Sequence, residues 1–340
     1  MNDNYKINLT ELDSHFKKMK GKRIVVLGDL MLDHYLWGSV DRISPEAPVP
    51  VVDIQKEEYR LGGAANVVHN LLMMEATPLV IGVIGDDRCS GEFINKMFEN
   101  KISTDFITRD STRSTTVKTR VYASGQQVMR YDIENRHDIS KNIEKFIMDR
   151  INLALQKADA MIIEDYNKGL LTPRIIQYAI KTANKLDVPI TIDPKVKNFF
   201  SYKNCTVFKP NLVEVQKNLN IEIRSDIELL EAAHELFKRI KPEYLIITLG
   251  EKGMMIFTRE NEIVQIPTFA KEVFDVCGAG DTVISVLTLC MAIGLDIKTS
   301  AIIANHAAGA VCGKRGIHPV TKEDIRLSVK YNNFMAVNQE

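Results

Sequence analysis

Five short apolar runs are spread along the chain, and each ends in a polar or glycine-containing corner. They cover residues 24–29, 161–165, 190–193, 207–210 and 244–250. Runs of this length are typical of strands that are buried on both faces of a parallel sheet. Helical patterns at 172–186 and 227–240 lie between several of them. The sequence therefore predicts an α/β protein with a doubly wound, mostly parallel sheet and helices on both faces, whose ligands bind at the carboxyl ends of the strands.

Two further regions alternate apolar and polar residues, which is typical of strands with one exposed face. They are 49–54 and 114–134, and the second is interrupted at Ser124-Gly125, as expected for a hairpin turn. We expect a small β lid, approximately within 33–57 and 112–134, on a single domain that spans 1–340. Because the open edge of a small lid is commonly covered by a second copy, the sequence also predicts a homodimer through the lid.

Composition narrows the classes of partner. Of the 340 residues, 45% are apolar, which is enough for a large core. The 44 basic and 44 acidic residues cancel, so no overall field favours nucleic acid or an anionic membrane. We therefore expect a small-molecule substrate, with neither nucleic acid nor membrane as a partner.

Cysteine usage and the N-terminal segment bear on location. The five cysteines lack C-x-x-C spacing, which argues against a disulfide framework or a zinc site and favours a reducing cytoplasm. Residues 1–20 contain acids and no apolar run, unlike a signal peptide. The uncharged stretch 282–295 is shorter than the ~20 residues that span a bilayer, so we expect it to form a buried helix.

Residues 273–282, Val-Phe-Asp-Val-Cys-Gly-Ala-Gly-Asp-Thr, carry the strongest functional signal. Gly278, Ala279 and Gly280 stand where a loop enters an apolar helix, so the backbone can approach an anion and stabilise its charge. Asp281 beside such an anion hole could accept a proton from an attacking hydroxyl during phosphoryl transfer. The pattern indicates a kinase-like site, and the alternative is an ordinary loop with an N-capping aspartate.

Two other segments offer groups that could bind a sugar. Gly62 and Gly63 would allow a ligand to lie against the backbone, and Asn66 could hydrogen-bond its hydroxyls. Asp33, in the corner after the first predicted strand, could accept bonds from paired hydroxyls. A tight turn and helix caps are the respective alternatives.

The corner 209–214 places Asn211 and Glu214 three residues apart at a helix start. There they could hold a magnesium-bound water cluster and nucleotide phosphates. Alternatively they form a capping box, with Asn211 as N-cap and Glu214 at the third helical position. The corners 165–169 and 193–195 each pair an acid with a lysine that could meet a substrate phosphate or remain a solvated charge.

Several other enzyme classes lose support. Residues 309–315 are one residue short of a P-loop, and no G-x-G-x-x-G after a strand, H-E-x-x-H or G-x-S-x-G is present. His69 and His306 fall in helical patterns, so we interpret them as packed or capping residues. Cys277 is interpreted as a small packing residue.

Together these segments resemble the ribokinase/PfkB family of sugar kinases over nearly the whole chain. Residues 62–66 are similar to its N-terminal signature, 211–214 to its N-x-x-E motif, and 275–281 to its C-terminal D-T-x-G-A-G-D signature. The resemblance implies a ribokinase-like fold, ATP and Mg²⁺ as cofactors, Asp281 as the base and 278–280 as the anion hole. Val276 and Cys277 depart from the usual signature, which could alter the placement of ATP without removing the base.

The resemblance also implies roles for the other segments. Around the nucleotide it places Asn211, Leu212, Val213, Glu214, Thr248, Gly250, Gly253 and Asn305, and Glu214 would reach the metal through water. Around the sugar it places Asp33, Gly62, Gly63 and Asn66.

Within the family, residues 41–52, 165–169, 193–195 and 281–285 resemble the kinases that act on D-glycero-β-D-manno-heptose 7-phosphate. That resemblance implies phosphorylation of the anomeric hydroxyl to give the 1,7-bisphosphate, in the synthesis of ADP-heptose for lipopolysaccharide cores. The remote phosphate of such a substrate needs cations, for which Arg42, Arg130 and Lys168 are the candidates.

Many kinases of this subgroup are fused to a nucleotidyltransferase half. Because only 20 residues follow Val320, we expect another protein to carry out the adenylyl transfer. Two alternatives remain open at this point. One is a kinase of the same family for another sugar or sugar phosphate, and the other is a non-catalytic sugar or nucleotide sensor with the same fold.

Overall fold

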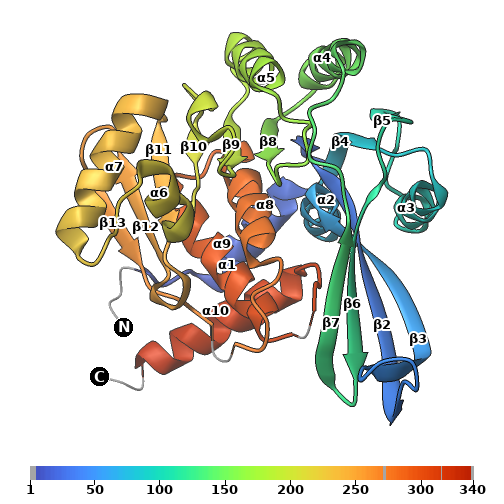
Figure 1. Ribbon diagram of the computed structural model, residues 1–340. Helices are drawn as coiled ribbons and strands as arrows, with labels where there is room; N and C mark the ends of the chain where they lie inside the picture. Colours follow the sequence, from blue (N-terminus) through green and yellow to red (C-terminus); the bar gives the residue numbers. More distant parts are fainter. Residues whose placement is uncertain (1–4, 271–272, 315, 338–340) are drawn as a thin grey trace.

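The computed structural model describes residues 5–270, 273–314 and 316–337. Its main sheet has nine strands in the order β13-β12-β11-β10-β9-β8-β1-β4-β5 (Figure 1). The seven strands from β11 to β5 are parallel, and β12 and β13 are antiparallel to their neighbours. The strands are β1 (Arg23–Gly28), β4 (Thr77–Ile84), β5 (Ile107–Arg109), β8 (Ala160–Glu164), β9 (Ile190–Asp193), β10 (Val207–Phe208), β11 (Tyr244–Thr248), β12 (Met254–Thr258) and β13 (Ile263–Ile266).

Helices cover both faces of this sheet, as the sequence predicts. Alternate residues of β1 enter two separate hydrophobic cores, Ile24 and Val26 one, Val25 and Leu27 the other. The first core is closed by α1 (Leu9–Met19), α2 (Ala64–Met73), α3 (Arg88–Glu99), α8 (Ala279–Ala292), α9 (Ile297–Cys312) and α10 (Lys322–Val337). The second is closed by α4 (Lys141–Leu155), α5 (Pro173–Lys185), α6 (Leu212–Leu219) and α7 (Asp226–Ile240). The predicted α/β class is therefore confirmed.

The uncharged stretch near the C-terminal end forms the central helix α8. Ten successive residues of this helix, 281–290, are buried, because α2, α9 and the strands β8 and β9 all pack against it. No helix within the described ranges has the length and apolar character that crossing a membrane requires.

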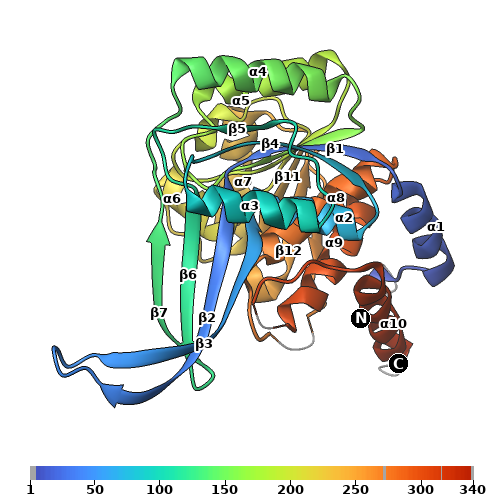
Figure 2. The ribbon, with the colours of Figure 1, turned by 90° about the vertical axis from the view of Figure 1, so that its right-hand side faces the viewer.

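A second sheet of four strands leaves the body of the protein as a long ribbon (Figure 2). Its strands are β2 (Leu30–Ile43), β3 (Pro50–Gly63), β6 (Thr116–Ala123) and β7 (Gln126–Ile133), in the order β3-β2-β6-β7. The hairpin between β6 and β7 turns at Ser124 and Gly125, whose φ angles of 49° and 82° are both left-handed, as two-residue hairpin turns require. We call these four strands the lid sheet.

The lid sheet extends further into the protein than the alternation pattern indicates. The first six residues of β2 and the last three of β3 are buried, so they lack the regular alternation of apolar and polar residues that marks the exposed part. As a result Asp33, Gly62 and Gly63 lie within strands. Gly62 and Gly63 end β3 and lead directly into α2.

Candidate active site

The glycine loop meets α8 at Gly278, the N-cap residue, whose φ of 80° is left-handed. Glycine is required there for its backbone freedom and because a Cβ would lie 2.9 Å from Nδ2 of Asn66. Residues 279–281 form the first turn, ahead of the first helical hydrogen bond from Thr282 N–H to the Gly278 carbonyl. A helix start of this kind presents backbone N–H groups and the positive end of the helix dipole.

Asp281 is the third residue of α8 and is only 5% exposed. Its Oδ1 accepts a hydrogen bond of 2.7 Å from the Tyr166 hydroxyl, and its Oδ2 accepts one of 2.7 Å from Nδ2 of Asn66. Burial raises the pKa of Asp281, and the charge of Asp193 acts in the same direction, whereas the two hydrogen bonds and Lys209 oppose the shift. A carboxylate with a raised pKa is a better proton acceptor than an ordinary aspartate.

Charged side chains from the neighbouring strand ends lie close to Asp281. The ammonium of Lys209 and Oδ2 of Asp193 are 2.7 Å apart, and both residues are buried. A Cβ at Gly280 would come within 3.5 Å of the same Asp193 oxygen. Glu164 at the end of β8 is also buried, and its Oε2 has no hydrogen-bond partner within the described residues. Burial, followed by the charge of Asp193, raises the pKa of Glu164 well above its usual value.

The lid sheet brings Asp33 to the same region. Asp33 is 1% exposed, lies opposite Lys118 in the β2–β6 register and forms an ion pair with Arg120. The backbone of Gly62 passes so close that a Cβ there would lie 2.1 Å from Oδ2 of Asp33. The neighbouring Gly63 has a left-handed φ of 56°. Both glycines are therefore required by the local geometry.

Asn66 connects the two glycines to Asp281. It lies in the first turn of α2, which begins directly after Gly63, and is 1% exposed. While its Nδ2 donates to Asp281, its Oδ1 is buried and finds no hydrogen-bond partner among the residues described. Since buried polar atoms are normally paired, this oxygen is a ready acceptor for a ligand hydroxyl.

The three predicted phosphate-binding cations are placed differently. Lys168 is partly buried and forms an ion pair with Glu134 near the lid sheet, and Arg130 is exposed and bonded to Asp132. Arg42 is exposed near the far end of β2, opposite Val51. It stands nine residues from Asp33, or roughly 30 Å along a strand. The structure does not bring Arg42 to this group, because β2 carries it away from the body of the protein.

Lys118 is a cation that the sequence analysis missed. It is half-buried, faces the same side of the lid sheet as Asp33, and lies 5.3 Å from the centre of the Tyr166 ring. Desolvation lowers its pKa despite the nearby charge of Asp33. Within the described residues Lys118 has no salt-bridge partner, unlike Arg120 and Lys168.

The predicted nucleotide-binding residues lie toward the other half of the main sheet. Asn211 and Glu214 form a complete capping box at the start of α6, where Leu212 and Val213 occupy the first two helical positions. Oε1 of Glu214 also accepts a bond of 2.5 Å from Lys195. The spacing therefore does form the cap, and Glu214 also lies beside the partly exposed Lys195.

Thr248, Gly250, Gly253 and Asn305 continue this row. Thr248 ends β11 and pairs with Asn211 in an isolated parallel bridge. Gly250 and Gly253 both have left-handed φ angles, and Nδ2 of Asn305 donates to the Pro267 carbonyl at 2.6 Å. A Cβ at Gly253 would collide with that same turn, 2.7 Å from the Pro267 carbonyl carbon. Thr248 is thereby joined to Asn211, and Gly253 and Asn305 both contact the turn at Pro267.

Tyr166 and Arg120, like Lys118, are site residues that the sequence did not single out. Tyr166 belongs to the corner 165–169, which was noted for its acid and lysine alone. Lys118 and Arg120 stand at alternate positions of β6, in the pattern of a strand with one exposed face. Only the register between β2 and β6, which are far apart in the chain, places them beside Asp33.

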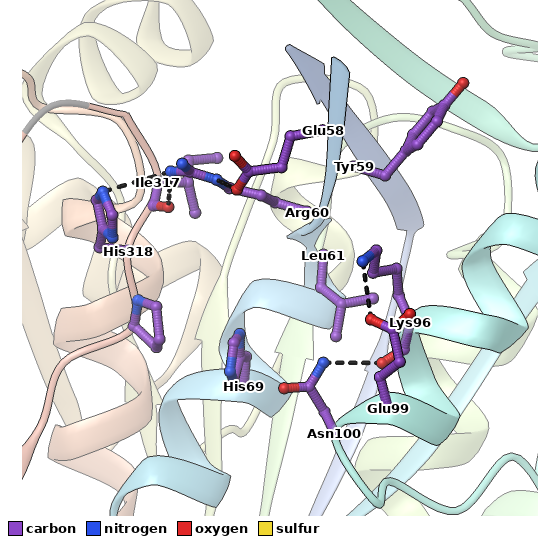
Figure 3. A pocket seen from close by; sticks show the side chains of 11 residues that line it. Glu58, Tyr59, Arg60, Leu61, His69, Lys96, Glu99, Asn100, Ile317 and His318 are labelled. Atoms are coloured by element: carbon purple, nitrogen blue, oxygen red, sulfur yellow. Dashed lines mark hydrogen bonds and ion pairs between the residues drawn. The ribbon is translucent and has the colours of Figure 1, made fainter. Parts of the chain in front are cut away.

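A separate cavity of about 250 Å³ lies between β3, α3 and residues 317–319 (Figure 3). It is lined by residues such as Tyr59, His69 and Lys96. Neither Asp281 nor Asp33 lines it. His306 is buried and stacks on Phe269, so it is a packing residue, as interpreted. His69 is only partly buried and faces the cavity, and desolvation lowers its pKa. Cys277 is exposed and is not the packed residue that the sequence predicts.

A mostly parallel sheet, a β ribbon that emerges at the carboxyl end of β1, and a buried aspartate at a glycine-rich helix start define a sugar kinase. Residues 22–323 match the family model described as pfkB family carbohydrate kinase. The chain belongs to this family, which confirms the predicted kinase activity on a carbohydrate.

Relatives and solved structures agree with this assignment. The chain is 43% identical over 306 residues to the bifunctional protein HldE of Aliarcobacter butzleri, covering 90% of this chain and 64% of the relative. It is 40% identical to HldE of Geotalea uraniireducens, covering 93% and 64%. The chain thus spans a little under two thirds of the length of these relatives.

The fold is similar to that of phosphofructokinase-2 from Escherichia coli in complex with potassium, with a TM-score of 0.74 and 16% identity. It is also similar to ribokinase from Arabidopsis thaliana complexed with ribose and ATP, with a TM-score of 0.70 and 16% identity. Each alignment covers 92% of this chain and 99% of the solved chain. These structures bear out the predicted ribokinase-like fold.

Proposed function

We propose that this sugar kinase transfers the γ-phosphoryl group of ATP to the anomeric hydroxyl of D-glycero-β-D-manno-heptose 7-phosphate. The product is the 1,7-bisphosphate, an intermediate toward ADP-heptose for lipopolysaccharide cores. The observation that carries the chemistry is the buried carboxylate of Asp281 at the start of α8, bonded to Asn66 of the first glycine motif. The heptose acceptor is supported by the resemblance of four segments and by the relatives named HldE.

In the proposed reaction Asp281 takes the proton of the anomeric hydroxyl as the oxygen attacks the γ-phosphorus. A new O–P bond forms, the bond to the β–γ bridging oxygen breaks, and ADP leaves with the electron pair. The N–H groups of 278–280 are assigned to the charge on the transferred group, whose stabilisation is the main catalytic demand in phosphoryl transfer. The N–H of Ala279 donates to the Val276 carbonyl at 3.2 Å in this structure and would exchange that partner for the phosphoryl group. The raised pKa of Asp281 suits a group that must hold that proton during the step.

The acceptor lies between α8 and the lid sheet in this proposal. Asp33 and the unpaired Oδ1 of Asn66 accept bonds from sugar hydroxyls. Gly62, whose backbone packs against the Asp33 carboxylate, and the adjoining Gly63 would lie beside the bound sugar. Lys118, which has no acid partner among the described residues, binds the remote phosphate of the sugar together with Lys168. Arg120 remains in its ion pair with Asp33. Arg130 is a further, more exposed contact, and Arg42 could reach such a phosphate only from another subunit.

ATP is proposed to lie along the row from Asn211 to Asn305. Mg²⁺ would neutralise charge on the phosphates. Both oxygens of Glu214 are already engaged, by Lys195 and by the Asn211 N–H, so this residue suits a metal held through water rather than direct ligation. Such water-rich coordination is usual for Mg²⁺, and no cluster of three potential ligands occurs in the described part of the chain.

Setting and assembly complete the proposal. We place the kinase in the cytoplasm, where ATP is available, and its five free cysteines fit a reducing compartment. We also propose a homodimer through the lid sheet, because β7 ends the strand order and exposes all eight of its residues.

The test is to incubate the purified chain with ATP, Mg²⁺ and a panel of acceptors, with mass analysis of the product. The expected result is a heptose bisphosphate, with kcat/KM at least tenfold above that for fructose 6-phosphate or ribose. Equal or better turnover of either of these sugars would overturn the heptose assignment and favour the alternative acceptor class. Lys118→Met should raise KM for a phosphorylated acceptor about tenfold or more, whereas Lys181→Met, on the exposed face of α5, should not.

A further inference from the structure

The corner after β8 holds Tyr166 in a fixed position. Its backbone N–H donates to Oδ2 of Asp29 at 2.9 Å, and the next residue but one, Lys168, donates its N–H to the same oxygen at 3.0 Å. Between them Asn167 adopts a left-handed φ of 56° and donates its N–H to Asp165. The buried carboxylates of Asp29 and Asp165 thus hold the backbone of this turn in place. The position from which the Tyr166 side chain projects is fixed as a result.

The hydroxyl of Tyr166 reaches the proposed base. It donates to Oδ1 of Asp281 at 2.7 Å, while Asn66 donates to Oδ2 at 2.7 Å. Each oxygen of the carboxylate therefore has its own donor, one from the β8 corner and one from α2. Two such bonds fix the plane of the carboxylate and favour its charged form.

The ring of Tyr166 lies close to two cations, one from each half of the site. Lys118 of the lid sheet is 5.3 Å from the ring centre, and Lys195 is 5.5 Å from it. Lys195 also binds Glu214 on the proposed nucleotide side. Burial and the charge of Asp281 raise the pKa of Tyr166 well above its usual value, so the phenol remains a donor throughout the ordinary pH range.

We propose that Tyr166 is a positioning residue, whose hydroxyl orients the carboxylate of Asp281 and biases it toward the proton-accepting form. This inference rests on the proposed role of Asp281 as the base. Other charged groups near Asp281 come from three strand ends and the lid: Glu164, Asp193, Lys209 and Lys118. They act by charge, whereas Tyr166 and Asn66 are bonded to the carboxylate.

Tyr166→Phe tests the proposal, because it removes the hydroxyl and keeps the ring close to the two lysines. Losing a hydrogen bond to a charged group is worth about 1.5–3 kcal/mol, which corresponds to a shift of roughly one to two pH units. The acidic limb of kcat/KM, measured with whichever sugar the wild-type chain phosphorylates, should therefore move to higher pH by about one unit. Above that limb the rate should stay within about tenfold of wild type.

The matched control is Tyr202→Phe. Tyr202 is fully buried, whereas Tyr166 is partly exposed, and the Tyr202 hydroxyl donates at 2.6 Å to another buried carboxylate, Asp165. Its loss therefore reports the cost of deleting a buried phenol. The control should leave the acidic limb in place. A uniform fall in rate at every pH for Tyr166→Phe, with the limb unmoved, would show a structural role only and overturn the proposal.

A direct titration separates this inference from the proposed function. Aspartate carboxyl signals of the ligand-free protein, followed by ¹³C NMR with Asp281→Asn to assign the site, should show Asp281 titrating at higher pH in Tyr166→Phe than in wild type. An unchanged midpoint would refute the role of Tyr166 even if the kinase is active. A shifted midpoint in a chain that phosphorylates no sugar would uphold the Tyr166 bond while rejecting the function. Tyr166→Leu should shift the midpoint in the same direction if the Phe variant folds poorly.

Discussion

Several residues of this site are in such close contact that the size or the hydrogen-bonding group of one depends on its neighbour. The space that a side chain at Gly62 would need is occupied by the Asp33 carboxylate, and Oδ2 of Asp281 is held by the amide of Asn66. Such pairs connect motifs that are far apart in the chain. Changing one member should therefore disturb the other, even where the changed residue carries no functional group.

Gly62→Ala should impair the sugar site. The new Cβ would lie 2.1 Å from Oδ2 of Asp33, so the carboxylate or the strand must move, and kcat/KM for the sugar should fall at least tenfold. Gly91→Ala is the control, since it adds the same methyl group in α3 with nothing within 4 Å. Removing a helical glycine should stabilise the control by up to about 1 kcal/mol. Steady-state kinetics and thermal unfolding of both variants would check this, and normal kinetics for Gly62→Ala would contradict the close contact.

Asp281→Asn should lower kcat by about 10²- to 10⁴-fold, because the proton acceptor is lost while size and burial are kept. Binding of ATP, measured by calorimetry, should persist, since the N–H groups of 278–280 are unchanged. A variant with the wild-type rate would show that another group is the base.

How far the sequence predicts these residues depends on whether a local pattern marks them. Asp281, Gly62 and Asn66 stand in glycine-rich segments at helix starts, which short-range backbone rules identify. Lys118 and Arg120 occupy alternating positions of an exposed-looking strand, and their place beside Asp33 is set by pairing between strands about 85 residues apart in the chain. Such pairing follows from the assembled sheets, which local patterns do not contain.

At the scale of helices and strands, α6 and α7 begin with the same device. Both have a complete capping box, Asn211 with Glu214 and Ser225 with Glu228, and in both the glutamate accepts the N-cap N–H at 2.9 Å. The box of α6 was predictable from spacing. The inner parts of β2 and β3 were not, because burial on both faces removes the alternation that marks a strand.

The capping boxes of α6 and α7 allow the capping role of Glu214 to be separated from its proposed role at the nucleotide site. Glu228→Gln should cause a small loss of thermal stability and leave kinetics unchanged, because that carboxylate lies at an exposed helix start. Glu214→Gln should in addition raise KM for ATP and the Mg²⁺ requirement by about tenfold or more, the usual effect of losing an outer partner of a metal. Kinetics at varied Mg²⁺ would distinguish them. If both variants lose stability alone, Glu214 acts only as a cap.

For the molecule as a whole, the buried carboxyl groups around the proposed base also affect the free energy of folding. Glu164, Asp193 and Asp281 lie at neighbouring strand and helix ends inside the protein, and Lys209 offsets part of their charge. Keeping carboxylates there costs folding free energy. The lid sheet adds a second feature at this scale, an exposed edge strand, β7, in which apolar and polar residues are mixed.

Glu164→Gln should stabilise the protein at pH 8. The folded-state pKa of Glu164 is raised by burial and by Asp193, so the folded protein binds this proton more tightly than the unfolded chain. The resulting stability is fully present below the ordinary glutamate pKa and is lost as pH rises through the folded pKa. Gln imitates the protonated form, so the variant should melt a few degrees above wild type at pH 8, with the difference vanishing toward pH 4. Melting curves across this range would test it, and a constant difference would refute it.

The lid dimer predicts a mass of two chains in solution. Met129→Asp places a charge on the exposed β7 and should give single chains by light scattering after size-exclusion chromatography. Ile227→Asp changes an even more exposed apolar residue on α7, away from the lid sheet, and should leave the dimer intact. Wild-type protein that remains a single chain at all concentrations would exclude this assembly.

The proposed base is made long after the two side chains that bond to it. Asp281 is separated from Asn66 by 215 positions and from Tyr166 by 115, while β1, at the middle of the sheet, pairs with strands on both sides of it. A ribosome translating this message has therefore made the acceptor-side strands and the parallel strands of the main sheet before the base exists. A nascent chain that still lacks α8 would lack the proposed base, so we expect phosphoryl transfer only after residues 279–292 have emerged and packed.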